Sequence, residues 1–225
     1  MRRFRSSMKS AATASGTVPD ALIQHFDAFL RGLVQQRIAT SPRAAPAAGV
    51  AHDPLDVQAT IQSGQLMRVN HTGEVCAQAL YIGQTATAKS ATQRECLQAA
   101  AEEELDHLAW CRDRLKELGA RPSHLNLVWY TGAYLIGLLS GLVGDRWSLG
   151  FLLETERQVV AHLETHLSQL PPADLVSRAI LTQMKDDEAK HAATAARQGA
   201  IELPQWVKRI MRIQAKFMTT LARRF

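Results

Sequence analysis

Residues 102–110 read EEELDHLAW and residues 185–193 read KDDEAKHAA, and each stretch contains the pattern Glu-x-x-His. The first pair is Glu104 with His107, and the second is Glu188 with His191. Three residues of an α-helix correspond to a rotation of about 300°, so the two members of each pair share one face of a helix. A carboxylate and an imidazole placed in this way can bind one metal ion. A single pair is common on exposed helices, whereas two pairs on separate helices indicate a shared metal site.

The apolar residues on both sides of these stretches recur at steps of three and four, which predicts helices almost throughout. Residues 40–54 hold three prolines and many alanines, and they predict a linker. No run alternates polar and apolar β-branched residues, so we expect an all-α bundle. The expected helices cover residues 20–39, 55–89 with a break allowed near Asn70, 91–118, 145–169, 173–199 and 204–223.

A helical bundle that holds two metal ions combines two Glu-x-x-His pairs with one inward Glu from each of two further helices. Residues 71–84 (HTGEVCAQALYIGQ) and 151–163 (FLLETERQVVAHL) offer such glutamates within apolar surroundings. The ligand set is rich in oxygen and lacks thiolate, so it suits two iron ions better than zinc. The six predicted metal ligands are Glu74, Glu104, His107, Glu156, Glu188 and His191.

Two other polar residues compete with the predicted single glutamates. Glu154 lies about 200° from Glu156 on an ideal helix, so only one of the two can face the site. Glu156 shares a face with apolar residues, and we therefore interpret Glu154 as a solvated charge. His71 stands three residues before Glu74, and we interpret it as a residue that supports the ligands or begins a helix.

Three further residues lie beside predicted ligands. His162 is about 120° from the direction of Glu156, so it either supports the site and handles protons or lies on the surface. Asp106 and Asp187 are interpreted as surface carboxylates, with a hydrogen bond to a ligand histidine as the alternative. No catalytic residue is identified beyond the metal site, and the three scattered cysteines do not suggest a metal role.

The net charge of +5 is unevenly distributed. Residues 1–19 and 203–225 are basic and contain no acidic residue, whereas the chain between them is acidic. This distribution argues against a nucleic-acid binder. Residues 1–19 predict a disordered tail or a mitochondrial presequence. The basic, amphipathic residues 204–223 favour a helix at an anionic membrane surface, with a plain bundle helix as the alternative.

Residues 125–144 contain no charged side chain and are long enough to cross a membrane. They also contain several glycines, which argue against an isolated membrane span. We expect this segment to line a channel for an apolar molecule within the bundle or at the membrane interface, and a true membrane span is the alternative.

Residues 68–84 (RVNHTGEVCAQALYIGQ), 154–167 (ETERQVVAHLETHL) and the two opening stretches together resemble the demethoxyquinol hydroxylases of ubiquinone biosynthesis, bacterial members above all. The resemblance covers residues 55–225 and places the iron ligands at the same six positions. It implies a ferritin-like four-helix bundle with additional membrane-interacting helices.

The activity that this resemblance implies is that of a membrane-associated monooxygenase. It would use O2 to hydroxylate a 2-polyprenyl-3-methyl-6-methoxy-1,4-benzoquinol, with electrons from an external donor or from the quinol. No flavin or nicotinamide motif is present. Other ubiquinone-biosynthesis proteins are expected partners. The expected location is the cytoplasmic face of a bacterial inner membrane, or alternatively the matrix face of the mitochondrial one.

Two other functions fit parts of the same pattern. An iron-storing or peroxide-detoxifying ferritin-like protein would share the metal site and lack a quinol pocket. A non-catalytic lipid-binding subunit of a quinone-synthesis complex would need no complete ligand set.

Overall fold

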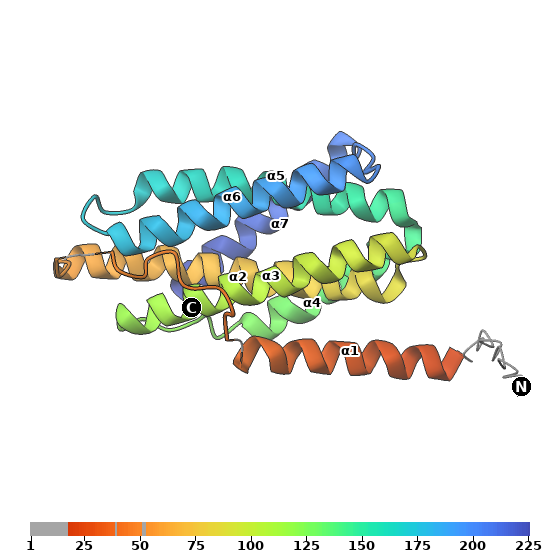
Figure 1. The fold of residues 1–225 in the computed structure, drawn as a ribbon, viewed down its shortest axis with the longest axis horizontal. Helices are drawn as coiled ribbons and strands as arrows, with labels where there is room; N and C mark the ends of the chain where they lie inside the picture. Colours follow the sequence, from red (N-terminus) through yellow and green to blue (C-terminus); the bar gives the residue numbers. More distant parts are fainter. Residues whose placement is uncertain (1–17, 39, 51–52) are drawn as a thin grey trace, which may run out of the picture.

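The computed structural model describes residues 18–38, 40–50 and 53–225, and their regular structure is entirely helical (Figure 1). The all-α prediction is therefore confirmed for the described part of the chain. Most of the predicted basic tail, residues 1–17, lies outside the described residues. The helices are α1 (Val18–Ile38), α2 (Val57–Thr87), α3 (Ala91–Glu117), α4 (Asn126–Val143), α5 (Asp145–Gln169), α6 (Leu175–Arg197) and α7 (Gln205–Arg224).

Four of these helices form a ferritin-like bundle. The consecutive helices α2 and α3 pack together, as do α5 and α6, and the two hairpins face each other through α2–α5 and α3–α6 contacts. Figure 1 shows α5 and α6 as one layer and α2 and α3 as the next. Apolar clusters fill both ends of the bundle, one around Met67, Leu115 and Leu181 and the other around Leu97 and Leu152. In each of the four bundle helices, the predicted ligands lie between residues of one cluster and residues of the other.

Helix α2 is continuous, so the break that the sequence allowed near Asn70 is wrong. Asparagine often interrupts a helix because its side chain bonds to nearby backbone groups. Here Asn70 is buried, and its Oδ1 lies 2.7 Å from Nδ1 of His166 on α5. The side chain therefore pairs across the bundle and leaves the backbone of α2 intact. The Asp56 side chain caps the start of this helix by accepting a hydrogen bond from the Ala59 amide.

Helix α4 packs closely against α2 through glycines. A Cβ atom added to Gly137 would lie 2.2 Å from the carbonyl oxygen of Leu80, and one added to Gly83 would lie 2.3 Å from that of Tyr134. Only glycine permits this approach of two backbones. The other face of α4 exposes apolar side chains, including Leu139. Within the described residues, α4 alone has the length and apolar composition to cross a membrane.

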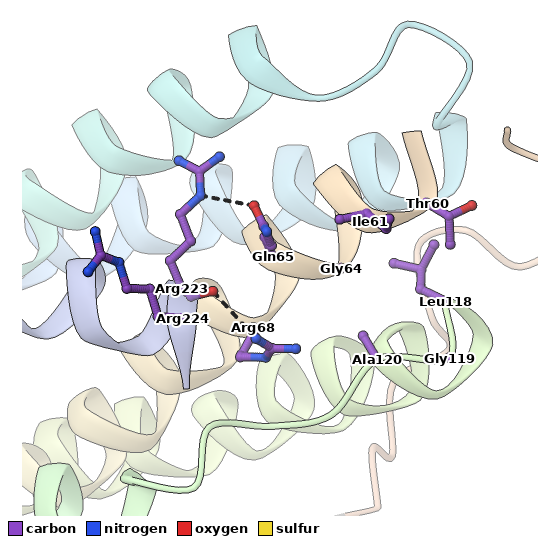
Figure 2. A pocket seen from close by; sticks show the side chains of 10 residues that line it. All are labelled: Thr60, Ile61, Gly64, Gln65, Arg68, Leu118, Gly119, Ala120, Arg223 and Arg224. Atoms are coloured by element: carbon purple, nitrogen blue, oxygen red, sulfur yellow. Dashed lines mark hydrogen bonds between the residues drawn. The ribbon is translucent and has the colours of Figure 1, made fainter. Parts of the chain in front are cut away.

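Two more helices cover the outside of the bundle. Helix α1 packs on α2 and α3, and its carbonyl groups accept hydrogen bonds from Tyr130 and Tyr134 of α4. Helix α7 packs on α2 and α5, and Figure 2 shows how its end joins α2. Nε of Arg223 donates to Gln65 over 3.2 Å, and Arg68 donates to the Arg223 carbonyl over 3.4 Å. These residues line a pocket of about 560 Å³ between α2, the turn after α3 and the end of α7.

Candidate metal centre

Six side chains from the four bundle helices meet in two overlapping groups. In the first group, ligand atoms of Glu74, Glu104, His107 and Glu188 all lie within 4.8 Å of one another. In the second, the same limit holds for Glu104, Glu156, Glu188 and His191. The two groups share Glu104 and Glu188, the glutamates of the two Glu-x-x-His pairs. The arrangement suits two cations bridged by two carboxylates, and the six predicted positions come together.

Burial makes this concentration of carboxylates costly in the absence of cations. Each of the four glutamates is at most 3% exposed. Burial, together with the charges of Glu188 and Glu74, raises the pKa of Glu104 well above its usual value. Burial and the charge of Glu188 raise the pKa of Glu156 to about 8. Burial also acts to raise the pKa of Glu188, but contacts with the two histidines outweigh it and lower that pKa to about 2.

The donor set fits a pair of divalent metal ions. Oε1 of Glu104 and Oε2 of Glu156 are buried without a hydrogen-bond partner among the described residues. Buried polar atoms are usually satisfied, and a metal ion beside each oxygen would provide the missing partner. A cation would also offset the repulsion between the carboxylates, which protons relieve in the metal-free protein.

Each histidine is held from the side away from the cluster by an acidic residue of the opposite helix. Nδ1 of His107 faces the carboxylates, 3.1 Å from Oε2 of Glu104, while its Nε2 lies 3.4 Å from Oδ2 of Asp187 on α6. Nδ1 of His191 lies 3.0 Å from Oε2 of Glu188, and its Nε2 lies 2.8 Å from Oε2 of Glu103 on α3. Such outer contacts fix the orientation of a ligand imidazole.

The interpretation of Asp106 and Asp187 as surface carboxylates is wrong, because both are at most 3% exposed. Asp187 lies at the α3–α6 contact and takes the alternative role, beside a predicted ligand histidine. Asp106 is covered by the segment before α2, where Ser41 donates a hydrogen bond to it over 2.7 Å and Arg43 lies 2.8 Å away. Local spacing gives no signal for this cover.

The interpretation of Glu154 as a solvated charge is also wrong. Its side chain is 8% exposed, accepts a hydrogen bond from Gln158 over 2.7 Å and lies 3.5 Å from Nζ of Lys208. Helix α7 covers this face of α5, which the spacing within α5 cannot reveal. Glu154 nevertheless stays outside both ligand groups, as its angle from Glu156 predicts.

His71 and His162 join neither ligand group. His71 is in the middle of α2, so its interpretation as a helix start is wrong; its Nδ1 lies 3.4 Å from Nδ2 of Asn126. Burial lowers its pKa to about 4. His162 is partly buried, with its ring centroid 3.9 Å from that of His166. Burial lowers the pKa of His162, although the charge of Glu74 opposes this effect, so the ring is neutral near pH 7.

Sequence reasoning missed Tyr81, whose hydroxyl donates a hydrogen bond to Oε1 of Glu156. A signal was available: Tyr81 is seven residues after Glu74 on α2, so two helical turns return it to the same inward face. Both residues are buried. The tyrosine therefore orients a predicted ligand from within the core.

Comparison with known proteins identifies relatives of this chain. The family model described as "Ubiquinone biosynthesis protein COQ7" matches residues 62–222. A protein from Chromobacterium violaceum named 3-demethoxyubiquinol 3-hydroxylase is 54% identical over 200 residues, covering 89% of this chain and 96% of the relative. A protein of the same name from Variovorax paradoxus is 54% identical over 205 residues, covering 91% and 97%. A third, from Legionella pneumophila (strain Corby), is 52% identical over 202 residues, covering 89% and 94%.

Proposed function

The chain belongs to the COQ7 family of ubiquinone biosynthesis proteins, and from this premise we propose that its buried Glu and His cluster is the di-iron centre of a 3-demethoxyubiquinol 3-hydroxylase. The protein is a hydroxylase of ubiquinone biosynthesis that acts on a benzoquinol with O2. The observation that carries the metal assignment is the pair of ligand groups sharing Glu104 and Glu188.

Each ion would have one histidine and carboxylates from three of the bundle helices. Glu74 and His107 would serve one ion, Glu156 and His191 the other, and the two shared glutamates would bridge them. When bound, two iron ions would supply the redox chemistry that places one atom of O2 on the quinol ring and releases the other as water. Electrons would come from an external donor or from the quinol.

The protein side chains have separate tasks in this reaction. The buried carboxylates would hold the cations between the two apolar clusters, and such burial limits side reactions with water. Tyr81 fixes Glu156 by a hydrogen bond. His162 is neutral, and its Nε2 is buried without a hydrogen-bond partner in the part of the chain that is described. A neutral imidazole of this kind can take a proton from a quinol hydroxyl during turnover.

We further propose that α4 and α7 attach the enzyme to an anionic membrane surface, where a polyprenyl substrate resides. Val207 and Met211 of α7 pack on the bundle, whereas Ile210 and Phe217 are exposed. Phe217 also meets Trp129 of α4 edge to face, with centroids 6.0 Å apart. The exposed apolar faces of the two helices therefore adjoin, and the basic side chains of α7 can contact lipid phosphates. The proposed location is the cytoplasmic face of a bacterial inner membrane.

We assign the catalytic domain to residues 55–225. Helix α1 and the segment before α2 are then additions that pack against its outside. All six proposed iron ligands come from α2, α3, α5 and α6, which supports this assignment.

Iron analysis and turnover under O2 test the proposed enzyme directly. Wild-type protein loaded with ferrous iron should bind two ions per chain and hydroxylate demethoxyubiquinol. A Glu104→Ala, Glu188→Ala variant removes both shared carboxylates and should lose the coupled iron pair and the activity. Glu102→Ala is the matched control, because that neighbouring glutamate is exposed. Full activity of the double variant would reject the di-iron assignment, and mineralised iron without quinol turnover would favour a storage protein.

Cosedimentation with vesicles tests the membrane proposal. Ile210→Glu and Phe217→Glu place a charge on the exposed apolar face of α7, and both should reduce binding to vesicles rich in anionic lipid. Gln205→Glu adds the same charge at the exposed start of the helix and should reduce binding less. Equal binding by all three variants and the wild type would reject α7 as the attachment site.

A further inference from the structure

Arg43, within the described residues 40–50, connects two helices of the metal centre from outside. Nε of Arg43 lies 2.8 Å from Oδ2 of Asp106 on α3, and its Nη2 donates to Oδ2 of Asp187 on α6 over 2.8 Å. Ser41 adds a hydrogen bond to Asp106. One guanidinium therefore joins α3 and α6, the two helices that carry the Glu-x-x-His pairs.

The contact with Asp187 leads directly to a ligand histidine. The oxygen of Asp187 that accepts from Arg43 also lies 3.4 Å from Nε2 of His107. The other oxygen of Asp187 accepts hydrogen bonds from Gln183 over 3.0 Å and from Lys190 over 2.9 Å. Both oxygens are thus held, so the carboxylate presents a fixed edge to the imidazole.

Trp110 completes this side of the centre. The guanidinium carbon of Arg43 lies 4.7 Å from the centroid of the Trp110 ring, a distance that allows a favourable cation–π contact. The same ring is 5.4 Å from the His107 ring, centroid to centroid, and is buried in the core. Arg43 is therefore held by two carboxylates and a rigid aromatic surface, rather than by solvent-exposed ion pairing alone.

The acidic partners of the two predicted ligand histidines differ in exposure and in pairing with a basic residue. His191 is held by Glu103, whose side chain is 47% exposed and, among the described residues, has no Lys or Arg within 4.0 Å. His107 is held by Asp187, which is 2% exposed and paired with Arg43. The chain thus buries and pairs the acidic partner of His107, whereas the acidic partner of His191 is exposed to solvent although its contact is shorter, 2.8 Å against 3.4 Å.

We propose that Arg43 is a positioning residue for the His107 half of the metal centre. By fixing Asp187 against α3, it holds the imidazole so that Nδ1 faces Glu104 and Glu188. This inference rests on the proposed function, because it concerns a metal ion at that position. Removal of a residue that directly contacts a ligand, as Asp187 contacts His107, weakens metal binding by about 10–100-fold. Arg43 acts one contact further out, so its removal should have a smaller effect.

Metal titration of full-length protein tests the proposal without relying on turnover. Co²⁺ serves as a spectroscopic probe, and the absorption of each bound ion is followed as the ions are added under anaerobic conditions. In Arg43→Gln we expect one ion to bind as in the wild type and the other to bind up to about 10-fold more weakly. Arg43→Lys keeps the charge but cannot span two carboxylates, so we expect an intermediate loss.

Two comparisons identify the affected half. In a His107→Ala background, Arg43→Gln should leave the affinity of the remaining ion unchanged, because both substitutions affect only the ion that His107 would bind. Glu103→Gln should weaken the other ion, and its effect should add to that of Arg43→Gln. Arg31→Gln is the control, because Arg31 forms an exposed ion pair with Asp27 on α1.

The outcomes separate this inference from the proposed function. A wild-type protein that binds no pair of ions refutes the di-metal centre itself. Two ions bound with wild-type affinity by Arg43→Gln overturn the role of Arg43 and leave the centre intact. If Arg43→Gln weakens the binding of both ions equally, the selective role of Arg43 is also overturned. This holds whether the protein is loosened as a whole or circular dichroism shows that it has unfolded. Arg43→Lys provides the same comparison with the positive charge retained.

Discussion

The contact between α2 and α4 predicts opposite effects for the same substitution at two glycines of one helix. In Gly137→Ala, the new Cβ would lie 2.2 Å from the Leu80 carbonyl oxygen and 3.1 Å from the Gln84 amide nitrogen. Both neighbours are backbone atoms of α2, so neither can move independently of its helix. In Gly132→Ala, the new Cβ has no atom within 4 Å.

The distances set the expected magnitude. The helices must move roughly 1 Å apart at Gly137 before the contact reaches an ordinary separation. Overpacking of this kind costs about 1–3 kcal/mol. At Gly132, alanine restricts the unfolded chain without a clash and should stabilise the protein by about 0.4–1 kcal/mol. The two variants should therefore differ by about 1.4–4 kcal/mol, which corresponds to roughly 3–16 °C in Tm.

Urea and thermal unfolding in a mild detergent, followed by circular dichroism, measure this difference. The free energy of unfolding should decrease for Gly137→Ala and increase slightly for Gly132→Ala, with the wild type between them. Equal stability of the two variants would refute the close packing of α4 on α2. A loss of stability in Gly132→Ala alone would show that α4 presents the opposite face.

Three further predictions concern the core and the metal centre. Tyr81→Phe leaves an oxygen of Glu156 without its donor and should cost about 1–3 kcal/mol in urea unfolding; unchanged stability would contradict the hydrogen bond. Burial raises the pKa of Glu156 to about 8. Burial acts to lower the pKa of His191, but hydrogen bonds with Glu156 and Glu188 outweigh it and raise that pKa to about 12. The folded, metal-free protein then binds more protons than the unfolded chain between pH 6.5 and 8, so its free energy of unfolding should fall across that range, and bound metal should abolish the fall. Arg114→Ala strips the buried Asp174 of a partner 2.8 Å away and should cost about 3–5 kcal/mol by urea unfolding; a loss below about 1 kcal/mol would contradict the pair.

The sequence predicts well whatever depends on one helix alone. A period of 3.6 residues fixes which side chains share a face, and therefore it brings Glu104 together with His107 and separates Glu154 from Glu156. The boundaries of the later helices can also be predicted, because proline, glycine and capping residues act within a single helix. The order of single glutamates and Glu-x-x-His pairs then indicates how four such faces can meet.

The wrong interpretations of Glu154, Asp106 and Asn70 share one cause, which is the packing of another element against the helix. Glu154 is buried because α7 packs over it, and Asp106 because Ser41 and Arg43 do. Asn70 stays helical because a histidine of α5 pairs with its side chain. The spacing of residues within the affected helix does not reveal any of these contacts, because the partners are far away in sequence.

The crossed pairs of acid and histidine make the centre depend on both hairpins. The α2–α3 hairpin carries His107, whose outer nitrogen is held by Asp187 of the α5–α6 hairpin. The latter carries His191, which is held in turn by Glu103 of the former. The two hairpins are thus related by an approximate two-fold pattern. An acidic side chain of each hairpin orients the predicted ligand histidine of the other. A hairpin folded by itself would have half of the metal donors, and its histidine would lack the acidic partner that orients it. High-affinity metal binding should therefore require that the two hairpins have packed together.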